Sequence, residues 1–104
     1  MYFESGIITS RNNNFVKWAA SLSEKKNRKN EGYFIAEGIK LSKEAFAAGL
    51  PIDYCVVAES KISECRAFLS DYESDEKFDK CKIITVSDGV FEKISTEKAP
   101  QGNN

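Results

Sequence analysis

The first clear pattern along the chain is a set of apolar residues at helical spacing. Phe15, Trp18, Ala19 and Leu22 recur at i, i+3, i+4 and i+7, and polar residues of the kind that cap helices stand just before them. This spacing places the four side chains on one face of a helix over about residues 13–28. Trp18 is therefore predicted to anchor the core rather than to stack on a nucleic-acid base.

A strand–helix unit is predicted after this helix. The apolar residues 33–36 predict a short buried strand, Glu37 and Gly38 form the turn after it, and residues 39–48 predict a second helix. Gly49 fits the left-handed position that commonly ends a helix.

Two further strand–helix units complete the pattern. Residues 52–58 predict a second strand, and Ser60 or Ser63 is expected to cap a third helix. Residues 82–86 are rich in β-branched side chains and predict a third strand, after which Ser87 is expected to cap a short helix. Strands that alternate with helices predict an α/β fold with a mostly parallel sheet, covered by helices on both faces.

The length fits one domain of 104 residues. We expect it to comprise a leading helix over residues 1–30, the strand–helix units over residues 31–95, and a polar linker over residues 96–104. Hydrophobic residues make up 41% of the chain, which is typical of a globular protein. No apolar run reaches the roughly 18 residues of a membrane span, and the first residues lack a signal-peptide pattern, which favours the cytoplasm.

The residues that support catalysis or metal binding are scarce. Cys55, Cys65 and Cys81 lie in apolar contexts without CxxC spacing, and the chain has no histidine. Small buried thiols are therefore expected in place of a metal site or a catalytic cysteine. No phosphate-binding glycine loop is present either, so the sequence predicts a binding protein.

Charge is unevenly distributed along the chain. The net charge is −1, but residues 1–50 carry +3 and residues 51–104 carry −4. For a single lysine, a solvated helix end that complements the helix dipole is the simpler interpretation. A cluster predicts an oriented contact with a polyanion, because neutralised phosphates dominate nucleic-acid affinity. The basic residues between positions 11 and 29 are Arg11, Lys17, Lys25, Lys26, Arg28 and Lys29, against one acid.

The turn at Glu37 and Gly38 is the second candidate binding feature. Ligands often sit where a strand of an α/β sheet ends and a helix begins, and glycine permits close approach of the backbone. Taken alone, the simpler interpretation is that Glu37 caps the helix that starts at Ile39.

Four stretches occur in a defined order along the chain. They are ITSRNNNFVKWAASL at residues 8–22, KKNRKNEGYFIAEGIKLSKEAFAAG at 25–49, VSDGVFEKIS at 86–95 and APQG at 99–102. Together they resemble the N-terminal substrate-binding domain of the SpoU (TrmH) family of RNA 2′-O-ribose methyltransferases. The stretch RKNEGYFIAEG is the most specific of these matches.

This resemblance implies a three-layer α/β/α sandwich like that of the ribosomal proteins that bind kink-turn RNA. It implies that the turn at Glu37 and Gly38 faces structured RNA, ribosomal or transfer RNA, with Lys40 early in the following helix. It also implies S-adenosylmethionine-dependent methylation by a separate catalytic domain after residue 102, through which the parent protein would form a homodimer. No catalytic, cofactor-binding or metal-binding residue is expected among these 104 residues.

Two other functions stay open at this level. A stand-alone kink-turn-binding or assembly protein would use the same fold and turn. A protein-interaction domain would dock a basic partner on the acidic residues 71–79. Under the methyltransferase interpretation, the expected RNA-binding residues are Arg11, Lys17, Lys25, Lys26, Arg28, Lys29, Glu37, Gly38 and Lys40.

Overall fold

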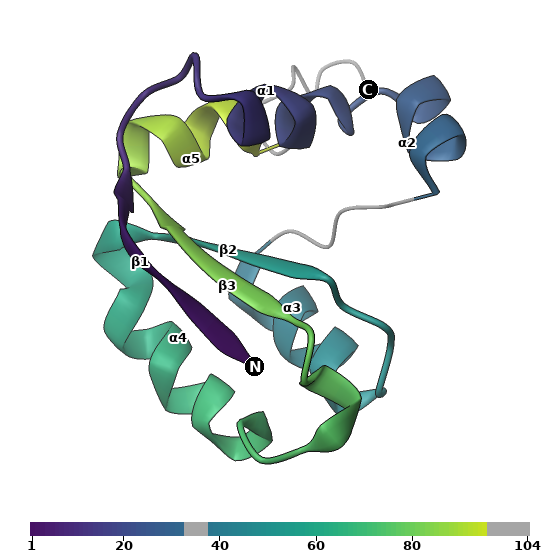
Figure 1. The fold of residues 1–104 in the computed structure, drawn as a ribbon, viewed down its shortest axis with the longest axis vertical. Helices are drawn as coiled ribbons and strands as arrows, with labels where there is room; N and C mark the ends of the chain where they lie inside the picture. The colour runs from purple at the N-terminus through teal and green to yellow at the C-terminus, as the bar shows by residue number, and fades with distance from the viewer. Residues whose placement is uncertain (33–37, 96–104) are drawn as a thin grey trace.

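The computed structural model of the protein describes residues 1–32 and 38–95. Its regular elements form a small α/β fold (Figure 1). The predicted strand over residues 33–36 and the predicted linker over residues 96–104 lie outside the described residues. The described strands and α-helices are β1 (Tyr2–Ile8), α1 (Asn14–Ser21), α2 (Lys25–Glu31), α3 (Gly38–Ala47), β2 (Tyr54–Ala58), α4 (Ile62–Leu69), β3 (Lys82–Val86) and α5 (Asp88–Ile94).

The three described strands form one sheet in the order β1-β3-β2, and all of them run parallel. Ile83 of the central strand β3 pairs with Phe3 on β1 and with Cys55 on β2. Parallel neighbours need long crossover connections, and the helices between the strands supply them. The prediction of an α/β fold with a parallel sheet is confirmed.

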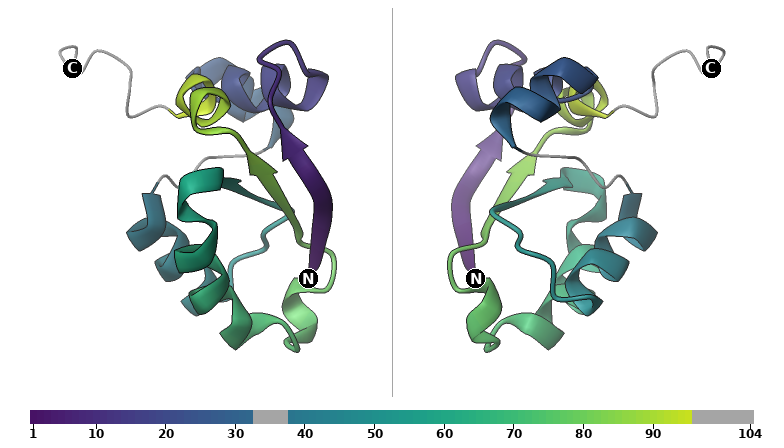
Figure 2. Two further views of the ribbon diagram at one scale, coloured as in Figure 1. Left: turned by 90° about the vertical axis from the view of Figure 1, so that its left-hand side faces the viewer. Right: turned by 90° about the vertical axis from the view of Figure 1, so that its right-hand side faces the viewer.

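Helices lie on both faces of the sheet (Figure 2). They enclose two apolar cores. On one face, α3 and α4 contribute Phe46 and Leu69, which pack with Ile83. On the other face, α1 and α5 pack against Val86, and Val90 of α5 is buried there. Successive residues of β3 point to opposite faces, so Ile83 supplies one core while Ile84 and Val86 supply the other, which produces an α/β/α sandwich.

The fold begins with strand β1, so the prediction that it begins with a helix is wrong. The sequence YFESGII has no clean alternation of apolar and polar residues. Gly6 takes a φ of 81°, and the register with β3 shifts between Phe3 and Ile7. An irregular strand of this kind carries no period-two pattern and forms because its backbone pairs with β3. Residues 1–30 accordingly hold β1, α1 and most of α2 in place of one leading helix.

The prediction of a single helix over residues 13–28 is also wrong, because the structure has two helices, α1 and α2, in this part of the chain. The apolar stripe ends at Leu22, which is buried, and the α2 sequence KKNRKNE offers no apolar residue to the core. The N–H groups of Leu22, Ser23 and Glu24 each donate to the carbonyl three residues earlier, which tightens and ends α1. α1 therefore packs on the sheet, whereas α2 lies beyond the end of α1 (Figure 1).

Two predicted helix ends are confirmed. The Ser87 hydroxyl accepts a hydrogen bond from the Val90 N–H at 3.2 Å and so caps α5. Gly49 has a φ of 71°, and the N–H groups of Gly49 and Leu50 donate to the last carbonyls of α3. This is the Schellman arrangement, which satisfies carbonyls that have no intrahelical partner.

The predicted cap of α4 is wrong. Neither Ser60 nor Ser63 occupies the capping position, which belongs to Lys61 and has no side-chain cap bond. A 3₁₀ turn, Glu59–Lys61, leads into the helix instead. The Ser60 N–H donates to a carboxylate oxygen of Asp88 at 3.1 Å, so this turn ties the end of β2 to the start of α5.

Candidate functional site

Helix α2 carries four of the basic side chains that the sequence singles out, three lysines and Arg28. Lys25, Lys26 and Lys29 are all exposed. Among the side chains that the structure describes, none forms an ion pair with these ammonium groups. Three neighbouring cations on one short helix repel one another, and a bound polyanion would relieve that repulsion.

Arg28 differs from its lysine neighbours because its side chain holds α2 in place. It is half-buried, and its Nη1 donates to the carbonyls of Leu22 at 3.0 Å and Ser23 at 2.9 Å. Asn27 adds a hydrogen bond from its Nδ2 to the Ser21 carbonyl at 3.0 Å. The carbonyls at the end of a helix need such partners, so Arg28 and Asn27 fasten α2 to α1 and orient the three lysines.

Arg11 and Lys17 lie toward the other end of α1. Arg11 is exposed in the loop between β1 and α1, and its carbonyl accepts a hydrogen bond from the Lys93 Nζ at 2.9 Å. Lys17 is exposed on α1 itself. Eight residues of helix span about 12 Å, so the loop with Arg11 and helix α2 stand at opposite ends of α1 (Figure 1). The basic residues thus follow α1 from end to end.

Lys93 is a neighbour of Arg11 that the sequence does not reveal. It lies on α5, 82 residues further along the chain, and only the docking of α1 beside α5 brings it to the loop. A Cβ at Gly89 would lie 3.6 Å from the Arg11 Nη2, so the guanidinium also reaches the start of α5. No local motif could have predicted this contact.

The predicted turn is only partly described. Glu37 lies outside the described residues, whereas Gly38 is the first residue of α3 and Lys40 is exposed one position after Ile39. Helix α3 packs on the sheet face opposite to α1 and α5. Lys40 therefore belongs to a different layer of the sandwich from Lys17.

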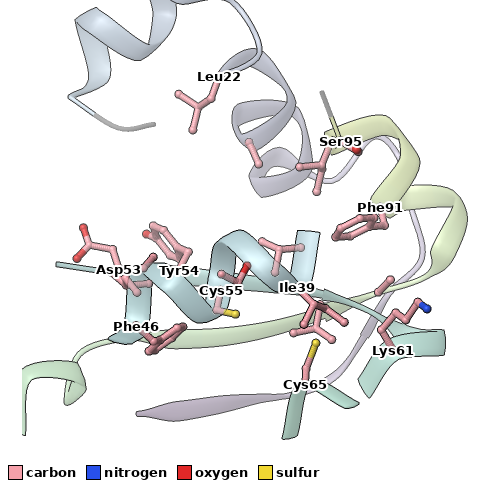
Figure 3. A pocket seen from close by; sticks show the side chains of 18 of the residues that line it. Leu22, Ile39, Phe46, Asp53, Tyr54, Cys55, Lys61, Cys65, Phe91 and Ser95 are labelled. Carbon is pink, nitrogen blue, oxygen red and sulfur yellow. The ribbon is translucent and has the colours of Figure 1, made fainter. Parts of the chain in front are cut away.

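An apolar cavity opens between α1, α3 and strand β2 (Figure 3). Its walls include Leu22 just after α1, Ile39 of α3 and Tyr54 of β2. Asp53 contributes one of its few charged groups. Gly32 also lines it.

The three cysteines are unreactive thiols packed against the α3–α4 face of the sheet. Burial raises the pKa of Cys55 to about 12 and that of Cys81 to about 11, and it raises the pKa of Cys65 as well. A thiol with such a pKa stays protonated near neutral pH and is a poor nucleophile. All three are free of disulfides.

Neither a cluster of metal ligands nor a membrane-spanning helix is found in the part of the chain that the structure describes. Within residues 1–32 and 38–95, no group of three or more acidic, cysteine or histidine side chains is arranged to hold a metal ion. The helices found there are also too short or too polar to cross a membrane.

Comparison with known proteins identifies the family. The model of the MRM3-like substrate binding domain matches residues 13–103, which is most of the chain and includes α1, α2 and the predicted turn. A search of curated proteins finds no match. Substrate-binding domains of this kind are associated with RNA methyltransferases, which implies an RNA partner. The chain therefore belongs to the MRM3-like substrate-binding domain family.

Proposed function

We propose that this chain is the RNA-recognition domain of a SpoU (TrmH) type RNA 2′-O-ribose methyltransferase and is not catalytic by itself. The family match over residues 13–103 is the observation that carries the proposal. Ribosomal or transfer RNA would be the substrate of the parent enzyme, which would dimerise through its catalytic domain. The three free cysteines fit a reducing compartment such as the cytoplasm.

We propose that S-adenosylmethionine binds to a separate catalytic domain and not to this one. The cavity beside β2 is lined mainly by apolar side chains. A charged sulfonium and an amino-acid group need several polar partners, whereas most of the side chains that line this cavity are apolar. We therefore assign methyl transfer to a separate domain, and binding of the RNA to this one.

Helix α2 supports the assignment of RNA binding. Its exposed lysines, Lys25, Lys26 and Lys29, can each approach a phosphate, while Arg28 fixes the helix against α1. Each phosphate that a cation neutralises releases counterions, so affinity should fall steeply with salt. Contacts of this type position the RNA without reading its sequence.

The test is RNA binding by the 104-residue chain as a function of salt. Replacing Lys25, Lys26 and Lys29 together by glutamine should weaken binding at low salt. The slope of log affinity against log salt concentration should become shallower by about 2 to 3, since each lost contact contributes roughly 0.7–0.9. Arg28 stays unchanged in this variant so that α2 keeps its position.

A matched control removes the same charge elsewhere. Lys43, Lys77 and Lys80 are exposed and lie outside the α1–α2 layer, so their replacement by glutamine should leave the slope nearly as it was. Equal effects of the two triple variants would show that net charge alone governs binding. Absence of any RNA binding at low salt would overturn the proposed function.

A further inference from the structure

A row of three side chains crosses the sheet near the amino ends of its strands. The register pairs both Tyr2 of β1 and Tyr54 of β2 with Lys82 of β3. The next residues on β1 and β3, Phe3 and Ile83, belong to the core under α3 and α4. Because successive residues of a strand point to opposite faces, Tyr2, Lys82 and Tyr54 all point to the face that carries α1 and α5. We call these three residues the tyrosine–lysine row.

Helix α1 reaches the Tyr54 end of the tyrosine–lysine row, and the rest of the row stays exposed. α1 and α5 pack over the other end of this face, where Ile84 and Val86 are buried. Tyr2 is 53% exposed, Tyr54 is 38% exposed, and Lys82 is exposed. Strands lie about 4.8 Å apart, so the two tyrosines stand about 10 Å from each other with the lysine between them.

The Tyr54 end of the row is held by neighbouring aromatic side chains. The Tyr54 ring centroid lies 5.1 Å from that of Phe15 and 5.6 Å from that of Trp18, both on α1. In Figure 3, Tyr54 points away from Phe46 and toward the α1 side of the sheet. A shallow groove beside it is lined by Tyr54, Phe15, Lys82 and, on β1, Glu4. The ring is thus oriented before any ligand arrives.

The charge of Lys82 decides which partner fits the row. Among the described residues, its ammonium has no ion-pair partner. An apolar protein surface docked here would bury that charge unpaired, which is costly, whereas a phosphate would pair with it. A partner that adds a strand beside β1 is also disfavoured, because the irregularity at Gly6 interrupts that edge. Two aromatic rings that flank a cation match single-stranded nucleic acid.

We propose that the tyrosine–lysine row binds unpaired nucleotides of the RNA substrate. Bases stack on the rings of Tyr2 and Tyr54, and a phosphate between them contacts Lys82. Glu4, in the same groove, repels phosphate and accepts hydrogen bonds from base amino groups, so it faces base edges. The proposal rests on the proposed function and adds the element recognised, which is a loop or bulge with splayed bases.

The experiment measures binding of the 104-residue chain to two probes, an unstructured RNA oligonucleotide and a blunt RNA duplex of the same length. Tyr2→Ala should lower affinity for the unstructured RNA by roughly 5- to 150-fold, which is the loss expected for one stacked base, and should leave duplex affinity unchanged. Tyr2→Phe keeps the ring and should restore binding. Lys82→Gln should make the salt slope for the unstructured RNA shallower by about 0.7.

The outcomes separate this inference from the proposed function. If the chain binds both RNAs and Tyr2→Ala leaves both affinities unchanged, the row is not a base-stacking surface, while the proposed function stands. If the chain binds neither probe, both fail. If Tyr2→Ala abolishes self-association in sedimentation while RNA affinity is unchanged, the row is a protein contact and the inference is overturned. Since Tyr2 is more than half exposed, the variant should fold, and circular dichroism checks this.

Discussion

Arg28 offers a test of whether α2 is positioned by one side chain or only by its own helical bonds. Its guanidinium donates to the carbonyls of Leu22 and Ser23, and α2 buries no apolar residue of its own. An isolated helix of seven residues is far below the length that is stable in water. Replacing Arg28 by lysine preserves the charge but removes the planar group that spans both carbonyls.

The expected loss follows from the two hydrogen bonds. A hydrogen bond to a charged group contributes about 1.5–3 kcal/mol when protected from water. One of these two bonds is exposed and the other only partly buried, and lysine can recover one of them. We therefore expect Arg28→Lys to favour local opening of α2 by about 1 kcal/mol, a factor of roughly 5 in its opening equilibrium.

Amide hydrogen exchange measured by NMR reads this equilibrium directly. The Gly32 N–H donates to the Arg28 carbonyl at 2.9 Å and reports on the end of α2. In Arg28→Lys this amide should exchange about 5-fold faster, while amides of β3 keep their wild-type rates. The control is Lys29→Gln, which should leave the exchange rates unchanged and make the salt slope of RNA binding shallower by roughly 0.7–0.9.

The opposite pattern would refute the reasoning. If Arg28→Lys leaves the exchange of the Gly32 amide unchanged but lowers RNA affinity, Arg28 contacts RNA itself and does not act by positioning α2. If Lys29→Gln accelerates exchange as much as Arg28→Lys does, the hydrogen bonds to Leu22 and Ser23 are not what holds the helix.

Two further predictions concern helix capping and the buried thiols. Ser87→Ala removes the hydroxyl that caps α5 and should lower the free energy of unfolding, measured with urea, by about 1 kcal/mol. The control Ser63→Ala changes an exposed serine without a capping role and should cost little. Equal losses in the two variants would contradict the assigned cap. Burial holds the pKa of the Cys81 thiol at about 11 in the folded protein, above its ordinary value of 9.0. The contribution of the protonated thiol to the free energy of unfolding is therefore complete below pH 9 and is lost as the pH rises toward 11. Cys81→Ser should flatten this pH dependence relative to wild type, and an unchanged profile would show that the thiol does not contribute to it.

The sequence alone determined those elements whose sequence patterns lie within a few neighbouring residues. The strand Lys82–Val86 was predictable because four of its five residues are β-branched. The Ser87 cap and the Gly49 helix end follow from the residue type at single positions. The concentration of lysines before position 30 is likewise visible in sequence. These features depend on neighbours within a few residues, so no long-range contact is needed to infer them.

Tertiary structure decided the features that depend on partners far along the chain. Strand β1 exists because its backbone pairs with β3, and the Lys93 contact with Arg11 exists because α5 packs beside α1. The tyrosine–lysine row likewise requires the register of three strands that are widely separated in sequence. A sequence pattern records the local period of a segment, but the side chains of different segments become neighbours only when the sheet fixes their register.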